Sequence, residues 1–121
     1  MDLNHFHIQV TDMSVARTFY ETFFEFSEDL VCGEDEIFIR NRQDFVLGLE
    51  RVANPESLPS WFHFGFGIQD EIPLKSLFEK MKNAGVKITR DLQDFGDSIN
   101  FYCVDPDGNK IEVYYNRQRK K

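Results

Sequence analysis

The sequence has little cysteine, only one run of basic residues and no long apolar run. Its two cysteines, Cys32 and Cys103, lie far apart and form neither a paired metal motif nor a disulfide framework. The net charge of -7 argues against a nucleic-acid surface, and we interpret the basic run 117–121 as a solubilising tail. No stretch approaches the ~18 apolar residues of a membrane span, and residues 1–5 lack the charged and apolar regions of a signal peptide. We therefore expect a cytoplasmic protein without a nucleic-acid or membrane partner.

Phenylalanine, in contrast, is abundant, with 13 copies in 121 residues. Hydrophobic residues make up 41% of the chain, which is enough for one folded domain with its own core. Aromatic side chains bury large areas and often line pockets for organic ligands. The composition therefore favours a small globular domain that binds a small molecule.

The most informative feature is an internal repeat. Residues 5–12, His-Phe-His-Ile-Gln-Val-Thr-Asp, resemble residues 63–70, His-Phe-Gly-Phe-Gly-Ile-Gln-Asp. In both segments a His-Phe pair opens an apolar-rich strand, and an aspartate follows seven positions after the histidine. Each copy is followed by a helical pattern, so the sequence predicts two related halves.

The first half predicts a helix near residues 13–26, with Asp12 or Ser14 as its cap. Apolar residues recur there at intervals of three and four, which places them on one helix face. These residues are Val15, Phe19, Tyr20, Phe23 and Phe24. We interpret this face as the contact between the helix and a sheet.

The second half predicts a helix near residues 72–84. Asp70 is its candidate cap, Pro73 suits an early helical position and Gly85 is a suitable stop. The same spacing of apolar residues recurs on one face of this helix. These residues are Leu74, Leu77, Phe78, Met81 and Ala84.

Strand-like segments follow each helix. In the first half they cover residues 29–32, 36–40 and 45–50, and in the second half residues 86–89, 99–104 and 110–115. Asp105-Pro106-Asp107-Gly108 predicts a turn that joins the last two segments as a hairpin.

The resulting order is βαβββ in each half. We expect an α+β domain with module one at 1–52, a turn-rich linker at 53–60, module two at 61–116 and a tail at 117–121. Each sheet has one face covered by its helix. We therefore expect the two sheets to form a cupped mixed sheet, with the helices on its outer face and a ligand in the cup.

Tandem βαβββ modules with a histidine near the start of each half, and Asp-Pro-Asp-Gly-x-x-x-Glu at the end, resemble the vicinal oxygen chelate superfamily. That superfamily includes glyoxalase I, extradiol dioxygenases, fosfomycin-resistance thiol transferases and bleomycin-resistance proteins. The resemblance covers residues 3–115. It is specific for the fold and less so for the reaction.

The resemblance implies one divalent metal ion held by His5, His63 and Glu112. The fourth position of the family pattern falls at Gly48, where glyoxalase I usually carries an acidic residue, and Glu50 lies two residues on, facing the same side of the strand. Two imidazoles and a carboxylate bind Mn, Fe, Ni or Zn without distinguishing among them, and they leave positions open for substrate oxygens.

Further candidates surround this set. His7 lies two residues from His5, on the same strand face, and is a candidate catalytic proton carrier together with Glu112. The candidate substrate-binding residues are Glu50, Trp61, Asn100, Tyr102 and Tyr114. Tyr102 matches a tyrosine of the fosfomycin-type transferases, whereas Asn100 replaces their usual serine.

The resemblance leaves three functions open. The first is a metal-dependent lyase, isomerase or thiol transferase that chelates a small oxygenated substrate. The second is a metal-free protein that sequesters a drug, which the acidic charge and the aromatic content also fit. The third is extradiol dioxygenation, for which His7 and Tyr102 match the subfamily poorly. Many relatives pair modules between chains, so we expect a homodimer.

Overall fold

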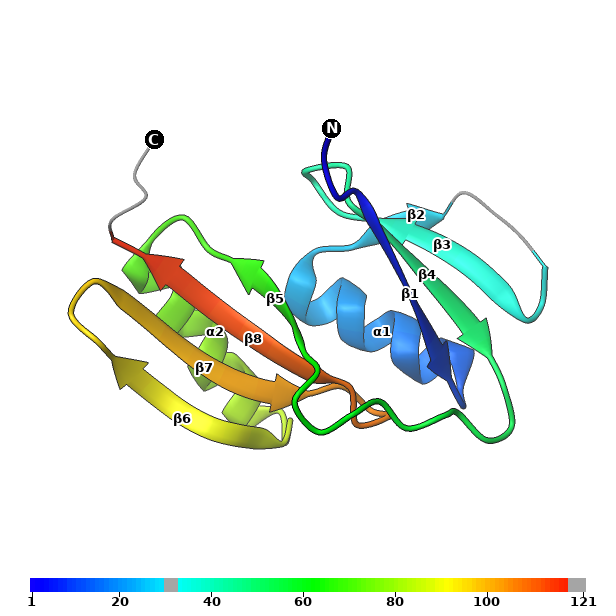
Figure 1. The fold of residues 1–121 in the computed structure, drawn as a ribbon. Coiled ribbons are helices and arrows are strands. Elements are labelled where there is room, and N and C mark those ends of the chain that lie inside the picture. Colours follow the sequence, from blue (N-terminus) through cyan, green and yellow to red (C-terminus); the bar gives the residue numbers. More distant parts are fainter. Residues whose placement is uncertain (30–32, 118–121) are drawn as a thin grey trace. The chain divides into compact units, whose positions relative to one another are not determined.

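The computed structural model describes residues 1–29 and 33–117, and the chain divides into two compact units, Met1–Ser57 and Leu58–Lys121 (Figure 1). The boundary falls inside the segment 53–60 that we expected as the linker. Each unit follows the order βαβββ and contains one four-stranded mixed sheet. The α+β class and the internal repeat are therefore confirmed.

In the first unit, β1 runs parallel to β4, and the sheet order is β1-β4-β3-β2. The elements are β1 (His5–Val10), α1 (Met13–Phe24), β2 (Ser27–Asp29), β3 (Glu36–Arg40) and β4 (Val46–Arg51). The strand that we expected at 29–32 thus begins earlier, at Ser27, and residues 30–32 lie outside the described part of the chain.

In the second unit, β5 runs parallel to β8, and the sheet order is β5-β8-β7-β6. The elements are β5 (Phe64–Gly67), α2 (Glu71–Asn83), β6 (Ile88–Asp94), β7 (Ser98–Val104) and β8 (Lys110–Asn116). Our expectation for β6, 86–89, was wrong. Residues 90–94 continue the strand but are mostly polar and exposed, so they lack the alternation that marks a strand.

Helix α1 packs on its sheet through a face that differs slightly from the expected one. Asp12 caps the helix by accepting a hydrogen bond from the Val15 amide. The buried side chains are those of Ala16, Phe19, Tyr20 and Phe24. Val15, which we expected on this face, is 48% exposed. The buried face centres on Ala16 and Tyr20, both of which are fully buried.

Helix α2 buries Leu74, Phe78 and Met81 against its own sheet, with the rings of Phe78 and Phe101 5.0 Å apart. Asp70 caps its start and Gly85 follows its end with a φ of 83°, as the sequence predicts. Ala84 is exposed because it lies beyond the last helical residue. Within the described residues, neither helix is long and apolar enough to cross a membrane.

The turn before β8 is held by a buried carboxylate. Asp105 is only 3% exposed, and it accepts hydrogen bonds from the amides of Asp107 and Asn109 and from the Asn109 side chain, each at 2.9 Å. The Gly108 amide closes the turn on the Asp105 carbonyl at 2.9 Å. This turn fixes where β8 begins and therefore where its side chains lie.

Arg117, which we assigned to the tail, is instead held by three elements of the second unit. Its guanidinium donates to Asp94 at 2.9 Å, to the Gly96 carbonyl at 2.7 Å and to Glu71 at 3.0 Å. The hydrogen bond from Arg117, followed by that from the Gly96 amide, lowers the pKa of Asp94 to about 2. The cluster joins the end of β8 to the β6–β7 hairpin and to the first turn of α2.

This cluster makes the unit sensitive to acid. The pKa of Asp94 is lower in the folded protein than its ordinary value of 3.8, so its stabilising contribution is complete above pH 4 and is lost as the pH falls toward 2. Between pH 4 and pH 2, the free energy of unfolding should therefore fall less in Arg117→Met than in wild type. Urea unfolding at several pH values measures this difference. Arg51→Met removes an ion pair with Asp35 in the other unit and serves as the control. A wild-type acid profile retained in Arg117→Met would contradict this role.

Candidate functional site

Side chains alternate strictly along the last two strands of the second unit. Ile99, Phe101 and Cys103 of β7, and Ile111 and Val113 of β8, are buried on the helix side. The intervening residues lie on the opposite face and are partly exposed. They include Asn100, Tyr102, Glu112 and Tyr114. The candidate residues that we expected on one face do share it, and we call this face of the second sheet the open face.

The parallel pairing of β5 with β8 brings the histidine segment beside these residues. Gly65 pairs with Glu112, and His63 lies two residues before Gly65. The strand itself begins at Phe64, so His63 immediately precedes it, whereas we expected His63 inside the strand. In the first unit His7 pairs with Gly48 and His5 lies two residues before His7. The two histidines therefore occupy corresponding positions in the repeat.

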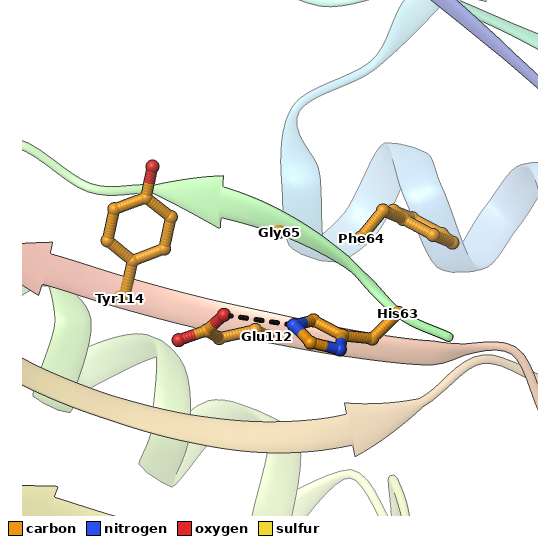
Figure 2. Close-up of a pocket in the computed structure, with 5 residues that line it drawn as sticks. All are labelled: His63, Phe64, Gly65, Glu112 and Tyr114. Carbon is orange, nitrogen blue, oxygen red and sulfur yellow. Dashed lines mark ion pairs between the residues drawn. The ribbon is translucent and has the colours of Figure 1, made fainter. Parts of the chain in front are cut away.

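His63 and Glu112 point toward one another across the β5–β8 pair (Figure 2). The distance between Nε2 of His63 and Oε1 of Glu112 is 3.4 Å. The other ring nitrogen, Nδ1, lies 3.3 Å from the carbonyl oxygen of Trp61. Both ring nitrogens thus face oxygen atoms that only accept hydrogen bonds, so a neutral imidazole can donate to just one of them.

The second oxygen of Glu112 is held by Asn100. The Asn100 amide donates from Nδ2 to Oε2 of Glu112 at 2.9 Å, from the neighbouring strand β7. Glu112 is 23% exposed, which is low for a carboxylate. Its two oxygens therefore have separate environments, one facing an amide donor and the other facing the imidazole.

Two tyrosines flank this pair. The Tyr102 ring lies edge-on to His63 with centroids 5.3 Å apart. Burial raises the pKa of Tyr102 above 10.0, the charge of Glu112 raises it further and Arg90 opposes the change. The Tyr102 hydroxyl is therefore protonated at neutral pH and is a hydrogen-bond donor. On the other side, the Tyr114 ring lies over β5, where a Cβ on Gly67 would come within 3.1 Å of it.

Two pockets adjoin the pair, and His63 lines both. One, of ≈ 350 Å³, is lined by His63, Phe64, Gly65, Glu112 and Tyr114 (Figure 2). The other, of ≈ 360 Å³, is lined by Trp61, His63, Thr89, Arg90, Tyr102 and Lys110. Trp61 itself is 76% exposed, so it is a wall residue and not a core anchor. Space for a small ligand thus exists on both sides of the imidazole.

The first unit carries a different histidine–carboxylate pair. Nε2 of His7 lies 3.0 Å from Oε1 of Glu50, and both side chains are more than 40% exposed, at 45% and 42%. A Cβ added to Gly48 would lie 3.0 Å from Nδ1 of His7 and 3.0 Å from the Phe38 ring. The space that a side chain at position 48 would need is therefore taken by His7 and Phe38.

The expected metal set is brought together in part. Within residues 1–29 and 33–117, no group of three or more His, Cys, Asp or Glu side chains is arranged to hold a metal ion. His63 and Glu112 form a pair, and His5 lies at the start of β1 with Nδ1 2.9 Å from the Asn4 side chain. Two of the three expected ligands thus lie in one unit at close range.

Arg90 is among the open-face residues that sequence reasoning did not single out. Its guanidinium donates to Oδ1 of Asn100 and lies 4.6 Å from the centre of the Tyr102 ring. The available signal was weak, because β6 was expected to end at Thr89. A longer β6 in the sequence analysis would have placed an arginine opposite β7.

The geometry can be compared with known proteins. The sequence model of the Glyoxalase/Bleomycin resistance protein/Dioxygenase superfamily matches residues 2–113. The chain belongs to this superfamily. The resemblance drawn from the repeat and from the Asp-Pro-Asp-Gly turn is therefore confirmed at the level of the superfamily.

Three superfamily members illustrate the relationship. A metallothiol transferase FosB of Bacillus licheniformis is 28% identical over 116 residues, which cover 94% of this chain and 75% of the relative. A glutathione transferase FosA of Serratia marcescens is 24% identical and covers 93% of this chain and 79% of its own length. The structure of a possible glyoxalase from Bacillus cereus superposes with a TM-score of 0.80 at 26% identity, over 93% of this chain and 97% of that one. The superfamily thus includes enzymes that transfer thiols.

The crowding at Gly48 yields a prediction about the first unit. In Gly48→Ala the added methyl must displace His7 or Phe38, so we expect a loss of about 1–3 kcal/mol in the free energy of unfolding, typical of an overpacked site. We also expect the NMR resonances of the His7 ring to shift as its contact with Glu50 changes. Gly33→Ala is the matched control, because nothing lies within 4 Å of the added Cβ. Equal stability and an unchanged His7 resonance would refute the crowding.

Proposed function

We propose that this chain is a metal-dependent enzyme that acts on a small oxygenated substrate, and that its reaction is a thiol transfer. The observation that carries the proposal is the pair of His63 and Glu112 on the open face. Of the two curated relatives above, one is named a metallothiol transferase and the other a glutathione transferase. These relatives favour thiol transfer over the isomerase, lyase and dioxygenase chemistries of the superfamily.

The residues of the pair fit a divalent metal ion. Two ligands of one tetrahedral ion, each bonded at ~2.0–2.2 Å, lie ~3.3–3.6 Å apart. The 3.4 Å between Nε2 of His63 and Oε1 of Glu112 falls within that range. Metal-binding imidazoles usually donate their second N–H to a carbonyl or carboxylate, as Nδ1 of His63 is placed to do with the Trp61 carbonyl. Asn100 orients the carboxylate in the same way.

We propose that His5 is the third ligand, in a homodimer where His5 of one chain joins His63 and Glu112 of the other. Its position in the repeat corresponds to that of His63. When bound, such an ion supplies a Lewis acid that polarises a substrate oxygen. The fourth family position is Gly48, and Glu50 contacts His7. We therefore propose that Glu50 orients the His7 ring, the remaining catalytic candidate, and does not complete the ligand set.

We propose that the thiol in the reaction comes from a second substrate, because the cysteine within the described residues cannot supply it. Cys103 is fully buried, and burial, followed by the nearby Asp105 charge, raises the pKa of its thiol to about 12. A thiol of this kind is neither accessible nor ionised at neutral pH, so it cannot act as the nucleophile. In the proposed reaction, the sulfur of an external thiol forms a C–S bond, a C–O bond of the substrate breaks, and the thiol proton is taken up by the released oxygen. The protonated hydroxyl of Tyr102 is placed to donate a hydrogen bond to such an oxygen.

Metal titration tests the ligand set. Glu112→Gln preserves size but removes the negative charge, so the affinity for Mn²⁺ or Zn²⁺ should fall by more than the roughly 10–100-fold lost when a partner of a metal ligand is removed. His5→Ala should have a comparable effect, whereas Glu50→Gln should change the affinity little. Isothermal titration calorimetry measures all four proteins. Equal affinity in wild type and Glu112→Gln would exclude the site and favour the metal-free, drug-sequestering alternative.

The same titration, carried out on a mixture of two variants, tests whether His5 comes from the partner chain of the dimer. If sites form between chains, mixing His5→Ala with His63→Ala creates dimers in which one site has all three ligands, and tight binding returns. If each site uses one chain, the mixture binds no better than either variant. The second result would contradict the proposed intersubunit site but not the ligand set.

Thiol consumption tests the reaction. We expect protein loaded with Mn²⁺ to accelerate the loss of free glutathione in the presence of a small epoxide, because ring opening joins sulfur to carbon. Glu112→Gln should abolish the acceleration. Tyr102→Phe, which retains the ring and removes the hydroxyl, should slow it. The assay uses a thiol-reactive dye, with protein stripped by chelator as the control. If the protein binds metal but consumes no thiol with a panel of epoxides and other oxygenated electrophiles, thiol transfer is contradicted and the metal site is not.

A further inference from the structure

Three side chains of the open face form a hydrogen-bonded chain across β6, β7 and β8. Arg90 donates from its guanidinium to Oδ1 of Asn100, and Asn100 donates from Nδ2 to Oε2 of Glu112. An arginine only donates hydrogen bonds and an ionised carboxylate only accepts them, whereas an amide has one acceptor oxygen and one donor nitrogen. Both hydrogen bonds can therefore form in just one of the two orientations of the Asn100 amide.

The guanidinium of Arg90 is also held by aromatic rings. It lies 4.6 Å from the centre of the Tyr102 ring and 5.7 Å from that of Phe95. Cation–π contacts of this kind restrict a long side chain that is otherwise exposed. Arg90 is thus a hydrogen-bond donor held in place at the β6 end of the three-residue network, although β6 is at the edge of the sheet.

The register of β6 places Arg90 on this face. Ile88 pairs with Cys103, Arg90 with Tyr102 and Gln93 with Asn100. Relative to β7, strand β6 therefore contains one extra residue before Arg90 and another after it. Side chains alternate between faces along a strand, and a shift of one residue moves a side chain to the other face. Without the first irregularity, Thr89 would lie opposite Tyr102 and Arg90 would point to the helix side. Such bulges often re-aim a side chain beside a functional site.

We propose that Arg90 is a positioning residue for Glu112. It holds the Asn100 amide with its nitrogen on Oε2 of Glu112, so that Oε1 stays directed at His63. The metal readout of this proposal rests on the proposed function of the His63–Glu112 pair, whereas the positioning itself is a property of the protein without metal.

The sign of the change in metal affinity separates positioning from simple charge. Arg90→Met removes a positive charge, and by Coulomb's law alone this would strengthen the binding of a cation. If Arg90 positions Glu112, the affinity for Zn²⁺ should instead fall about 10-fold, the lower end of the loss expected when the support of a metal ligand is removed. Arg90→Lys retains a donor and should recover part of the affinity. Lys87→Met, which removes a charge just before the same strand, controls for electrostatics and should not weaken binding.

A double-mutant cycle tests the route through Asn100. In an Asn100→Ala background the hydrogen-bond route from Arg90 to Glu112 is already broken, so Arg90→Met should produce no further loss of Zn²⁺ affinity. Additive losses in the double variant would overturn the proposed route. A tighter affinity in Arg90→Met alone would show that Arg90 acts only through its charge, and would overturn the proposal as well.

A readout without metal keeps the proposal testable if the chain binds no ion. In ¹⁵N-edited NMR spectra of the metal-free protein, the Nδ2 proton of Asn100 that faces Glu112 should resonate downfield. In Arg90→Met this signal should move toward the value of a free amide, whereas in Lys87→Met it should stay in place. An unchanged Asn100 signal in Arg90→Met overturns the positioning role. A wild-type protein that shows the shift but binds no metal contradicts the proposed function and leaves the positioning of Glu112 supported.

Discussion

The parallel hydrogen-bond ladder between the first and last strands of each unit, β1 with β4 and β5 with β8, determines where the chemistry lies. A parallel pair requires a crossover, which the helix supplies, and the helix covers one face of the sheet. Residues from opposite ends of the unit's sequence thereby become neighbours on the other face. In the second unit the register sets Gly65 against Glu112 and brings His63 within 3.4 Å of the carboxylate. A slip of one residue would turn Glu112 toward the core, where Ile111 and Val113 now lie fully buried.

At the equivalent position of this ladder, the two units have the side chain and the glycine on opposite strands. In the first, His7 lies opposite Gly48, and in the second, Gly65 lies opposite Glu112. Each pair combines one candidate site residue with one glycine. A Cβ on Gly48 would lie 3.0 Å from the His7 ring, and a Cβ on Gly65 would lie 3.3 Å from the backbone oxygen of Glu112. The repeat is thus asymmetric at this position. In the first unit the carboxylate near His7 is that of Glu50, two residues after Gly48.

Much of this arrangement could be predicted from sequence, since it follows from periodicity and turn chemistry. The helices, the Asp105–Gly108 turn and the shared face of Asn100, Tyr102, Glu112 and Tyr114 all depend on local spacing. The extension of β6 could not be predicted, because an exposed edge strand needs no alternation of apolar and polar residues. The two register shifts in β6 also interrupt the alternation of side chains between the two faces. Arg90 was missed for that reason. The contact of His7 with Glu50 depends on rotamers across two strands, which sequence spacing does not specify.

The protonation of His63 bears on the use that we propose for the His63–Glu112 pair. With a proton on Nδ1 directed at the Trp61 carbonyl, the lone pair on Nε2 faces a carboxylate oxygen, and two acceptors at 3.4 Å repel one another. Asn100 relieves only Oε2, so it does not remove this repulsion. A proton on Nε2 removes it, and so would a metal ion bonded to both atoms. A proton satisfies just this pair, whereas a metal ion also has coordination positions left for substrate oxygens. The space between Nε2 and Oε1 is therefore the position that we propose for the metal ion, because a metal ion there, unlike a proton, could also engage a substrate oxygen.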